Sequence, residues 1–107
     1  MFADYFKDRY LRYKAPGKSN STQRRYSRAY DLIKENFGNT KLSKMTSTKY
    51  QDFFNKYGQT RAKVTVQKTN GTIRSCVKDA VSEGLISFNF TDRINLTWND
   101  EKTQKID

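Results

Sequence analysis

Aromatic side chains recur through this sequence at intervals of three and four residues, and this spacing constrains the fold more than any other feature. The 107 residues include seven Phe, seven Tyr and one Trp, although hydrophobic residues of all kinds make up only 35%. A chain this rich in rings departs from the composition of disordered segments. Intervals of three and four residues place side chains on one face of a helix. We therefore expect one small helical domain with a core built largely from aromatic rings.

Two helices are predicted in the first third of the chain. The first spans residues 2–13 and ends before Pro16, which restricts the backbone of the residue that precedes it. The second begins at Asn20 or Ser21, whose side chains can cap its free N–H groups, and Gly38 stops it. The inner face of this second helix consists of Tyr26, Ala29, Tyr30, Ile33 and Phe37.

A third helix is predicted after a connector that buries Leu42 and Met45. It is capped by Thr46 or Ser47, runs to about residue 56 and is closed by Gly58. Its inner face consists of Tyr50, Phe53, Phe54 and Tyr57. Nucleotide stacking is an alternative use for such rings, but their helical spacing favours packing in the core.

Residues 63–84 fit two structures. The β-branched residues at 64–66 and the Asn70-Gly71 pair favour a hairpin. A helix ending at Gly84 fits equally well, because it would place one apolar stripe on its inner face. That stripe consists of Val66, Thr69, Ile73, Val77 and Ala80, with Cys76 beside it as a small buried residue. The pattern alone leaves both structures open.

The C-terminal part of the chain is predicted to be extended. Ile94, Leu96 and Trp98 alternate with polar residues, which indicates a short strand or an extended exit from the domain. Residues 99–107 are polar, and we expect a tail or linker there.

Basic residues dominate the body of the chain. The formal net charge is +10, from 21 Lys and Arg against 11 Asp and Glu. Residues 15–30 and 53–78 contain no acid, and the first of these stretches holds Arg24, Arg25 and Arg28. Such a surface suits double-stranded DNA, because Lys and Arg displace counterions from the phosphates and Arg can also contact guanine. A basic face that only keeps the protein in solution is the simpler interpretation.

The residue inventory excludes several other functions. There is no histidine and only one cysteine, so the chain offers no His general base, no internal disulfide and no multi-cysteine zinc site. The acids show no metal-binding spacing. No apolar run approaches the ~20 residues that span a membrane, and no signal sequence is present. These absences predict a soluble intracellular domain without a His or multi-cysteine metal site.

Several short motifs follow one another in a characteristic order. They are Ser21-Thr22 with Tyr26, Asn36-Phe37-Gly38, residues 41–46, residues 50–54, residues 65–68 and residues 80–86. Over residues 1–98 this order resembles the core-binding domain of tyrosine recombinases, the SAM-like N-terminal domain of phage and conjugative-element integrases. The resemblance implies an all-α, four- to five-helix SAM-like bundle in which residues 63–83 form one helix. The family usually continues into Asn-Pro, where this chain has Asn89-Phe90.

The resemblance also implies a function. The domain would grip core-type attachment-site DNA during integration or excision of a mobile element, and residues 99–107 would lead to a missing catalytic domain. The fragment itself would not be an enzyme. Its partners would be duplex DNA, that catalytic domain and other recombinase protomers in a synaptic complex, without any membrane. The implied location is the cytoplasm of a bacterial host, with a phage or mobile element encoding the protein. A SAM-like helical protein-interaction domain is the alternative.

The candidate DNA-binding residues lie on two of the predicted helices. Arg24, Arg25 and Arg28 lie near the start of the second, largely off its apolar face. On the fourth, the polar residues off the stripe could read bases or contact phosphates, and Gly71 would permit close approach of DNA. The full candidate set is Thr22, Arg24, Arg25, Arg28, Thr65, Gln67, Lys68, Asn70 and Arg74. No catalytic or metal-binding residue is predicted.

Overall fold

The computed structural model describes residues 1–10, 12 and 16–101. Within these residues every regular element is helical, so the all-α prediction is confirmed. Of the two structures predicted for residues 94–98, the extended exit is present and the short strand is not. The elements are α1 (Phe2–Arg9), α2 (Asn20–Phe37), the short 3-10 helix η2 (Leu42–Lys44), α3 (Ser47–Gly58) and α4 (Lys63–Ser82).

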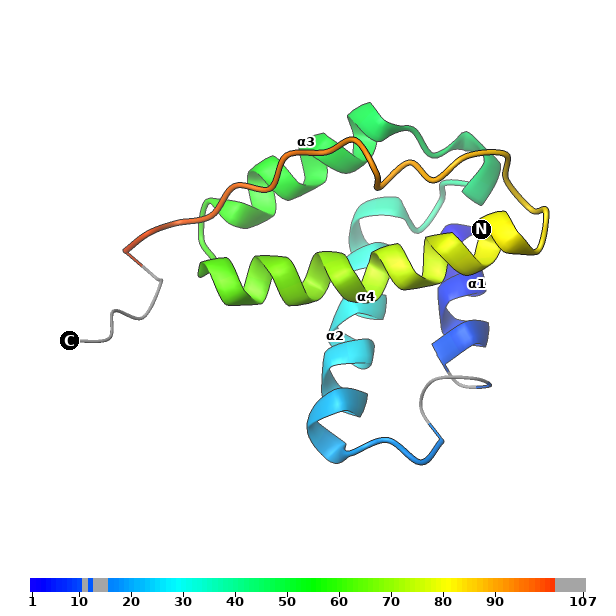
Figure 1. Cartoon of the computed structure of the whole chain (residues 1–107), viewed down its shortest axis with the longest axis horizontal. Coiled ribbons are helices and arrows are strands. Elements are labelled where there is room, and N and C mark those ends of the chain that lie inside the picture. The colour runs from blue at the N-terminus through cyan, green and yellow to red at the C-terminus, as the bar shows by residue number, and fades with distance from the viewer. Residues whose placement is uncertain (11, 13–15, 102–107) are drawn as a thin grey trace.

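The helices form two crossed pairs (Figure 1). Helices α1 and α2 run antiparallel to each other, and α4 crosses both of them. Helix α3 lies beside α4 and runs in the opposite direction. Because α4 contacts α2 as well as its own partner α3, it can bring side chains from both halves of the chain together.

Hydroxyl side chains cap α2 and α3. Ser19 is the N-cap of α2, where its Oγ accepts a hydrogen bond from the Thr22 backbone N–H at 3.3 Å. The prediction of Asn20 or Ser21 at this position is therefore wrong by one or two residues, because several neighbouring polar side chains can cap a helix equally well. Thr46 caps α3 as predicted, by accepting from the Lys49 N–H at 3.1 Å.

Helix α4 settles the contested stretch. Residues 63–82 form one continuous helix, so the hairpin across Asn70-Gly71 does not form. All five residues of the predicted stripe are buried, as is Cys76. Tertiary burial therefore outweighs the local turn preference of Asn-Gly. Gly84 follows with a φ of +76°, the left-handed conformation that ends many helices and favours glycine.

The core contains a connected group of aromatic rings. Phe90 lies 5.6 Å from Phe2 and 5.6 Å from Tyr50 between ring centroids, and all three are buried. Phe90 thus joins α1 to α3, and its ring fills the core between the two helices.

The chain leaves the bundle along an extended path beside α3 and α4 (Figure 1). Asn95 exchanges two hydrogen bonds with the Gln51 side chain, at 2.7 and 2.8 Å. A side chain on Gly58 would collide with the Thr97 carbonyl, so glycine is needed for this close approach. Asn99 then donates to the carbonyls of α3's C-terminal turn and of Arg61. The exit segment therefore bonds to the Gln51 side chain and to carbonyls at the end of α3, and not to a neighbouring strand. This explains why its alternating apolar residues do not form a β-strand.

Candidate nucleic-acid interface

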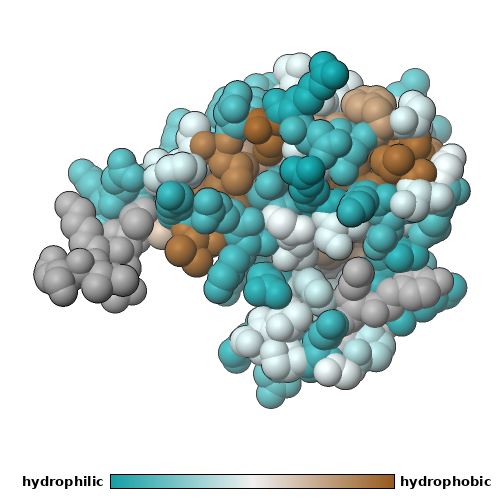
Figure 2. Space-filling model, viewed as in Figure 1, coloured by the Kyte–Doolittle hydropathy of each residue, from teal (hydrophilic) through white to brown (hydrophobic). Residues whose placement is uncertain are grey.

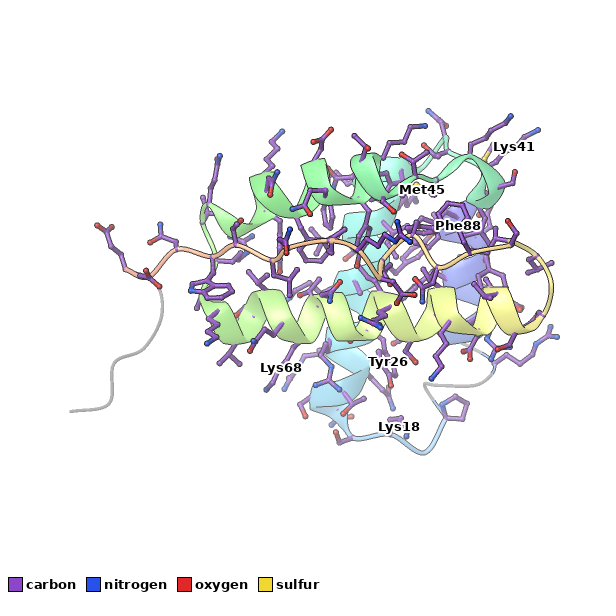
Figure 3. All side chains as sticks on the ribbon, turned by 45° about the horizontal axis from the view of Figure 1, so that its top comes forward. Lys18, Tyr26, Lys41, Met45, Lys68 and Phe88 are labelled. Carbon is purple, nitrogen blue, oxygen red and sulfur yellow. The ribbon has the colours of Figure 1, made fainter. Side chains whose placement is uncertain are left out.

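The two acid-free stretches of the sequence meet at one cleft. The cleft has a volume of about 300 Å³ and opens between α1, α2 and α4. Figure 3 shows Tyr26 of α2 and Lys68 of α4 on the same side of α4, with Lys18 in the loop before α2. The residues that line it are Phe6, Arg9, Tyr10, Arg25, Tyr26, Lys68, Gly71, Thr72, Ser75 and Cys76.

Three arginines lie in the first half of α2, and one of them lines this cleft. Arg25 lines it, and its guanidinium carbon lies 6.0 Å from the centroid of the Tyr26 ring. Arg28 is three residues further along α2, so it neighbours Arg25 on the helix surface, and Arg24 neighbours Arg28 in the same way. Arg24 and Arg28 are exposed. Within the described part of the chain none of the three forms an ion pair, so their charge is available to an external anion.

One flank of α4 continues this surface. Lys68 is exposed at the cleft, and Thr65 lies one turn before it on the same flank. Together these side chains form what we call the α2–α4 face. The residues of this face are Arg24, Arg25, Arg28, Thr65 and Lys68. In Figure 2 the hydrophobic residues in view gather in the upper half, whereas the lower part, where α2 begins, is hydrophilic to neutral.

Three candidates lie on the other flank of α4, toward α3 and the exit segment. Asn70 accepts a hydrogen bond from the hydroxyl of buried Tyr50 at 2.8 Å. Arg74 forms an ion pair with Asp92 at 2.7 Å. Gln67 is exposed on this side, seven residues before Arg74. The structure therefore does not bring these three together with the α2–α4 face, and it gives Asn70 a packing role.

Thr22 belongs to the capping arrangement of α2. Its Oγ1 accepts a hydrogen bond from the Ser19 hydroxyl at 3.0 Å, and its backbone N–H donates to the same Ser19 oxygen. The side chain is half-buried. Thr22 thus contributes to the start of α2, close to the arginines that follow it.

The opposite end of the cleft is occupied by a different arginine. Arg9 of α1 donates to Asp79 at 2.9 Å and to Glu83 at 2.6 Å, both on the C-terminal part of α4 or just after it. The Tyr5 hydroxyl donates to the same Glu83 carboxylate at 3.0 Å. We call these four residues the α1–α4 lock. One cation bridges two carboxylates there, and these contacts fasten α1 to α4.

Among the described residues, no group of three or more His, Cys, Asp or Glu side chains that could hold a metal ion occurs. Among the helices of residues 1–10, 12 and 16–101, none is long and apolar enough to cross a membrane.

Known structures place this arrangement among the helical domains of phage integrases. Residues 1–58 match the family described as the phage integrase N-terminal SAM-like domain. The chain belongs to this family, and the resemblance predicted from its motifs is confirmed. Among curated proteins no relative matches.

Two solved structures support the assignment over nearly the whole chain. A fragment of phage integrase SSP1947 from Staphylococcus saprophyticus, solved by NMR, is 39% identical with a TM-score of 0.81, over 94% of this chain and 89% of that one. The N-terminal domain of the prophage pi2 protein 01 integrase from Lactococcus lactis, a crystal structure, is 26% identical with a TM-score of 0.81. That match covers 89% of this chain and 93% of the other.

Sequence reasoning missed several residues of the cleft. Arg9, Tyr10 and Ser75 all line it. Ser75 could have been found from its seven-residue spacing to Lys68, which places both on one flank of α4. Arg9 and Tyr10 come from a helix more than 50 residues earlier, and no local pattern connects them to α4.

Proposed function

We propose that this domain binds double-stranded DNA through the α2–α4 face, as the N-terminal half of a tyrosine recombinase that encloses its target. The DNA would be a core-type attachment site used in integration or excision of a mobile element. One observation carries the proposal: two acid-free stretches, separated in the sequence by residues 31–52, fold against one cleft and leave Arg25 and Lys68 without acidic partners among the described residues.

The chemistry of this face suits a duplex. Lysine and arginine that neutralise phosphates release condensed counterions, which makes binding favourable and dependent on salt. The major groove admits an α-helix, and arginine can donate two hydrogen bonds to guanine. The exposed Arg24 and Arg28 are suited to such contacts, because nothing in the described fold holds them to another charge. Membership of the integrase family supports the same interpretation.

The catalytic groups would belong to another domain of the recombinase. In this proposal the exit segment leads from Asn99 to a catalytic domain, which provides the nucleophile and the cationic groups around the scissile phosphate. The domain described above has a binding role and needs no cofactor. Other protomers of the recombinase would be its partners in a synaptic complex within the bacterial cytoplasm.

The test is the affinity of the purified chain for duplex DNA across a salt series. We expect micromolar or weaker binding at physiological salt and a steep linear fall of log K with log salt, because most of the affinity comes from phosphate contacts. Fluorescence anisotropy with a labelled duplex measures both quantities. Absence of binding at about 50 mM salt would overturn the proposal and favour the protein-interaction alternative. Strand cleavage by the nuclease-free chain would overturn the assignment of catalysis to another domain.

A further inference from the structure

The cleft between α1, α2 and α4 is larger and chemically richer than a gap left by imperfect packing. Its volume of about 300 Å³ reaches the lower end of the range for ligand pockets. Aromatic and apolar groups, Phe6, Tyr26 and Cys76 among them, form part of its wall. Cationic and hydroxyl groups form the remainder. Such a combination suits a ligand that is anionic at one end and less polar at the other.

Gly71 is a feature of this cleft that the fold does not require. It lies in the middle of α4, where glycine costs about 1 kcal/mol relative to alanine. Its φ is not positive, and a Cβ built on it meets no atom within 4 Å. Internal packing therefore gives no reason for glycine here. A group that approaches the helix backbone from outside would give one.

Arg25 supplies a second, independent feature. Its Nε is buried, yet this donor has no hydrogen-bond partner among the described residues. Buried donors are normally satisfied, because an unpaired one costs free energy. Lys68, across the cleft on α4, is exposed and forms no ion pair with a described residue. Two cationic groups thus face one opening, and one of them lacks an acceptor.

No acid of the described residues forms an ion pair with Arg25 or Lys68. Asp79 and Glu83 are bound by Arg9, at 2.9 and 2.6 Å, at the other end of the opening. Neither acid lines the cleft, whereas Arg9, Arg25 and Lys68 all do. The end formed by Arg25 and Lys68 therefore favours an anion.

We propose that this cleft binds one phosphate ester of a nucleotide, with Arg25 and Lys68 on the phosphate and the attached sugar against the wall beside Gly71. The terminal N–H groups of the Arg25 guanidinium donate to a phosphate oxygen, and Lys68 donates to another. Ser75, exposed at the same opening, is a further donor within the cleft. Where the phosphate belongs to bound duplex DNA, this assignment rests on the proposed function. The cleft is then the main point at which the domain holds the DNA.

A substitution at Gly71 tests the site without removing any charge. Gly71→Gln places a flexible side chain at the cleft and favours the helix. Its matched control is Ser82→Gln, an exposed position about 16 Å further along α4. We expect Gly71→Gln to weaken duplex binding about tenfold, the value of one lost charge-assisted contact. Ser82→Gln should bind like the parent, and thermal unfolding should show both variants folded.

Side-chain NMR provides a second test of the site. It also distinguishes a phosphate of duplex DNA from the phosphate of a free nucleotide. The ¹⁵Nε resonance of Arg25 is followed during titration with a short duplex, with thymidine monophosphate and with inorganic phosphate. We expect it to shift with the duplex, while Arg74, already paired with Asp92, does not. A shift with the mononucleotide but not with the duplex would retain the site and assign it to a free nucleotide.

The two proposals fail in distinguishable ways. If the parent binds duplex DNA, Gly71→Gln binds equally well and no probe shifts Arg25, the cleft site is overturned while DNA binding stands. If the parent does not bind duplex DNA, the proposed function fails, and the mononucleotide titration alone decides the site. In that case an unshifted Arg25 resonance overturns it.

Discussion

The two ends of the α1–α2–α4 cleft hold arginines in opposite states. At one end, Arg9 is largely buried and bound to Asp79 and Glu83. At the other end, Arg25 lines the opening without an acidic partner among the described residues. Both side chains carry the same charge, and they lie in neighbouring helices. Partners, not composition, separate an arginine that holds the fold together from one that can bind a ligand.

This difference predicts that Arg9→Ala affects stability most. The substitution leaves two carboxylates of the α1–α4 lock without their cation and removes two charge-assisted hydrogen bonds. We expect the free energy of unfolding to fall by about 2 kcal/mol, after allowance for the exposure of Glu83 to solvent. Guanidinium denaturation measures it.

Arg12→Ala is the matched control for Arg9. Arg12 pairs with Asp8 at 3.4 Å on the surface, so its loss should cost less than about 0.5 kcal/mol. Equal losses of stability in the two variants would show that the lock contributes no more than an exposed ion pair.

Arg25→Ala and Lys68→Ala should do the opposite of Arg9→Ala: they should lower the affinity for DNA and leave the stability nearly unchanged. Neither cation forms an ion pair in the described fold, so stability should change by less than about 0.5 kcal/mol. Duplex affinity should fall about tenfold for each, and the salt slope should decrease by about one. Lys56→Ala on α3 removes the same charge outside the α2–α4 face and should bind like the parent. If all three variants bind equally, only net charge matters and the face is not the binding surface.

Asn70→Ala separates packing from recognition on the other flank of α4. The substitution leaves the buried Tyr50 hydroxyl without its acceptor, which should cost about 1 kcal/mol of stability. Duplex affinity, measured where the variant is folded, should stay within about twofold of the parent if Asn70 makes no DNA contact. A large loss of affinity at unchanged stability would return Asn70 to the DNA-binding set.

The lock should also respond to alkaline pH. Partial burial, and then the hydrogen bond to Glu83, raise the pKa of the Tyr5 hydroxyl well above its ordinary value of about 10. A pKa raised by folding means that the protonated hydroxyl contributes stability fully below about pH 10, and that this contribution is lost as pH rises further. Tyr5→Phe should therefore lose less stability than the parent between about pH 8 and pH 11. Denaturation midpoints at the two pH values test this, and equal losses in both proteins would contradict it.

The fold could be predicted from the sequence wherever the spacing of apolar residues within one helix defined its buried face. The stripe from Val66 to Ala80 predicted the inner face of α4 residue by residue. The motif order supplied what the stripe could not decide, since Asn70-Gly71 favours a turn on local grounds. Phe90 escaped prediction because its burial depends on Phe2 and Tyr50, which are distant in the sequence.

The candidate site was less predictable, because it is assembled from three helices. Helical spacing placed Lys68 and Arg74 off the apolar stripe alike, but it could not say which flank of α4 would meet α3. That flank holds Asn70 and Arg74 in contacts with Tyr50 and Asp92. The other flank meets α2 and opens into the cleft. Only the packing of the helices distinguishes the two.

The central claim is that DNA lies on the α2–α4 face, and a chemical-shift titration tests it most directly. Backbone ¹H–¹⁵N spectra of the chain are recorded as a short duplex is added at low salt. We predict that the largest changes fall on residues 22–28 and 65–75. The exposed Lys41 and Lys44, at the η2 end of the molecule, should change little. Changes concentrated around η2 and α3, with residues 22–28 unaffected, would contradict the account.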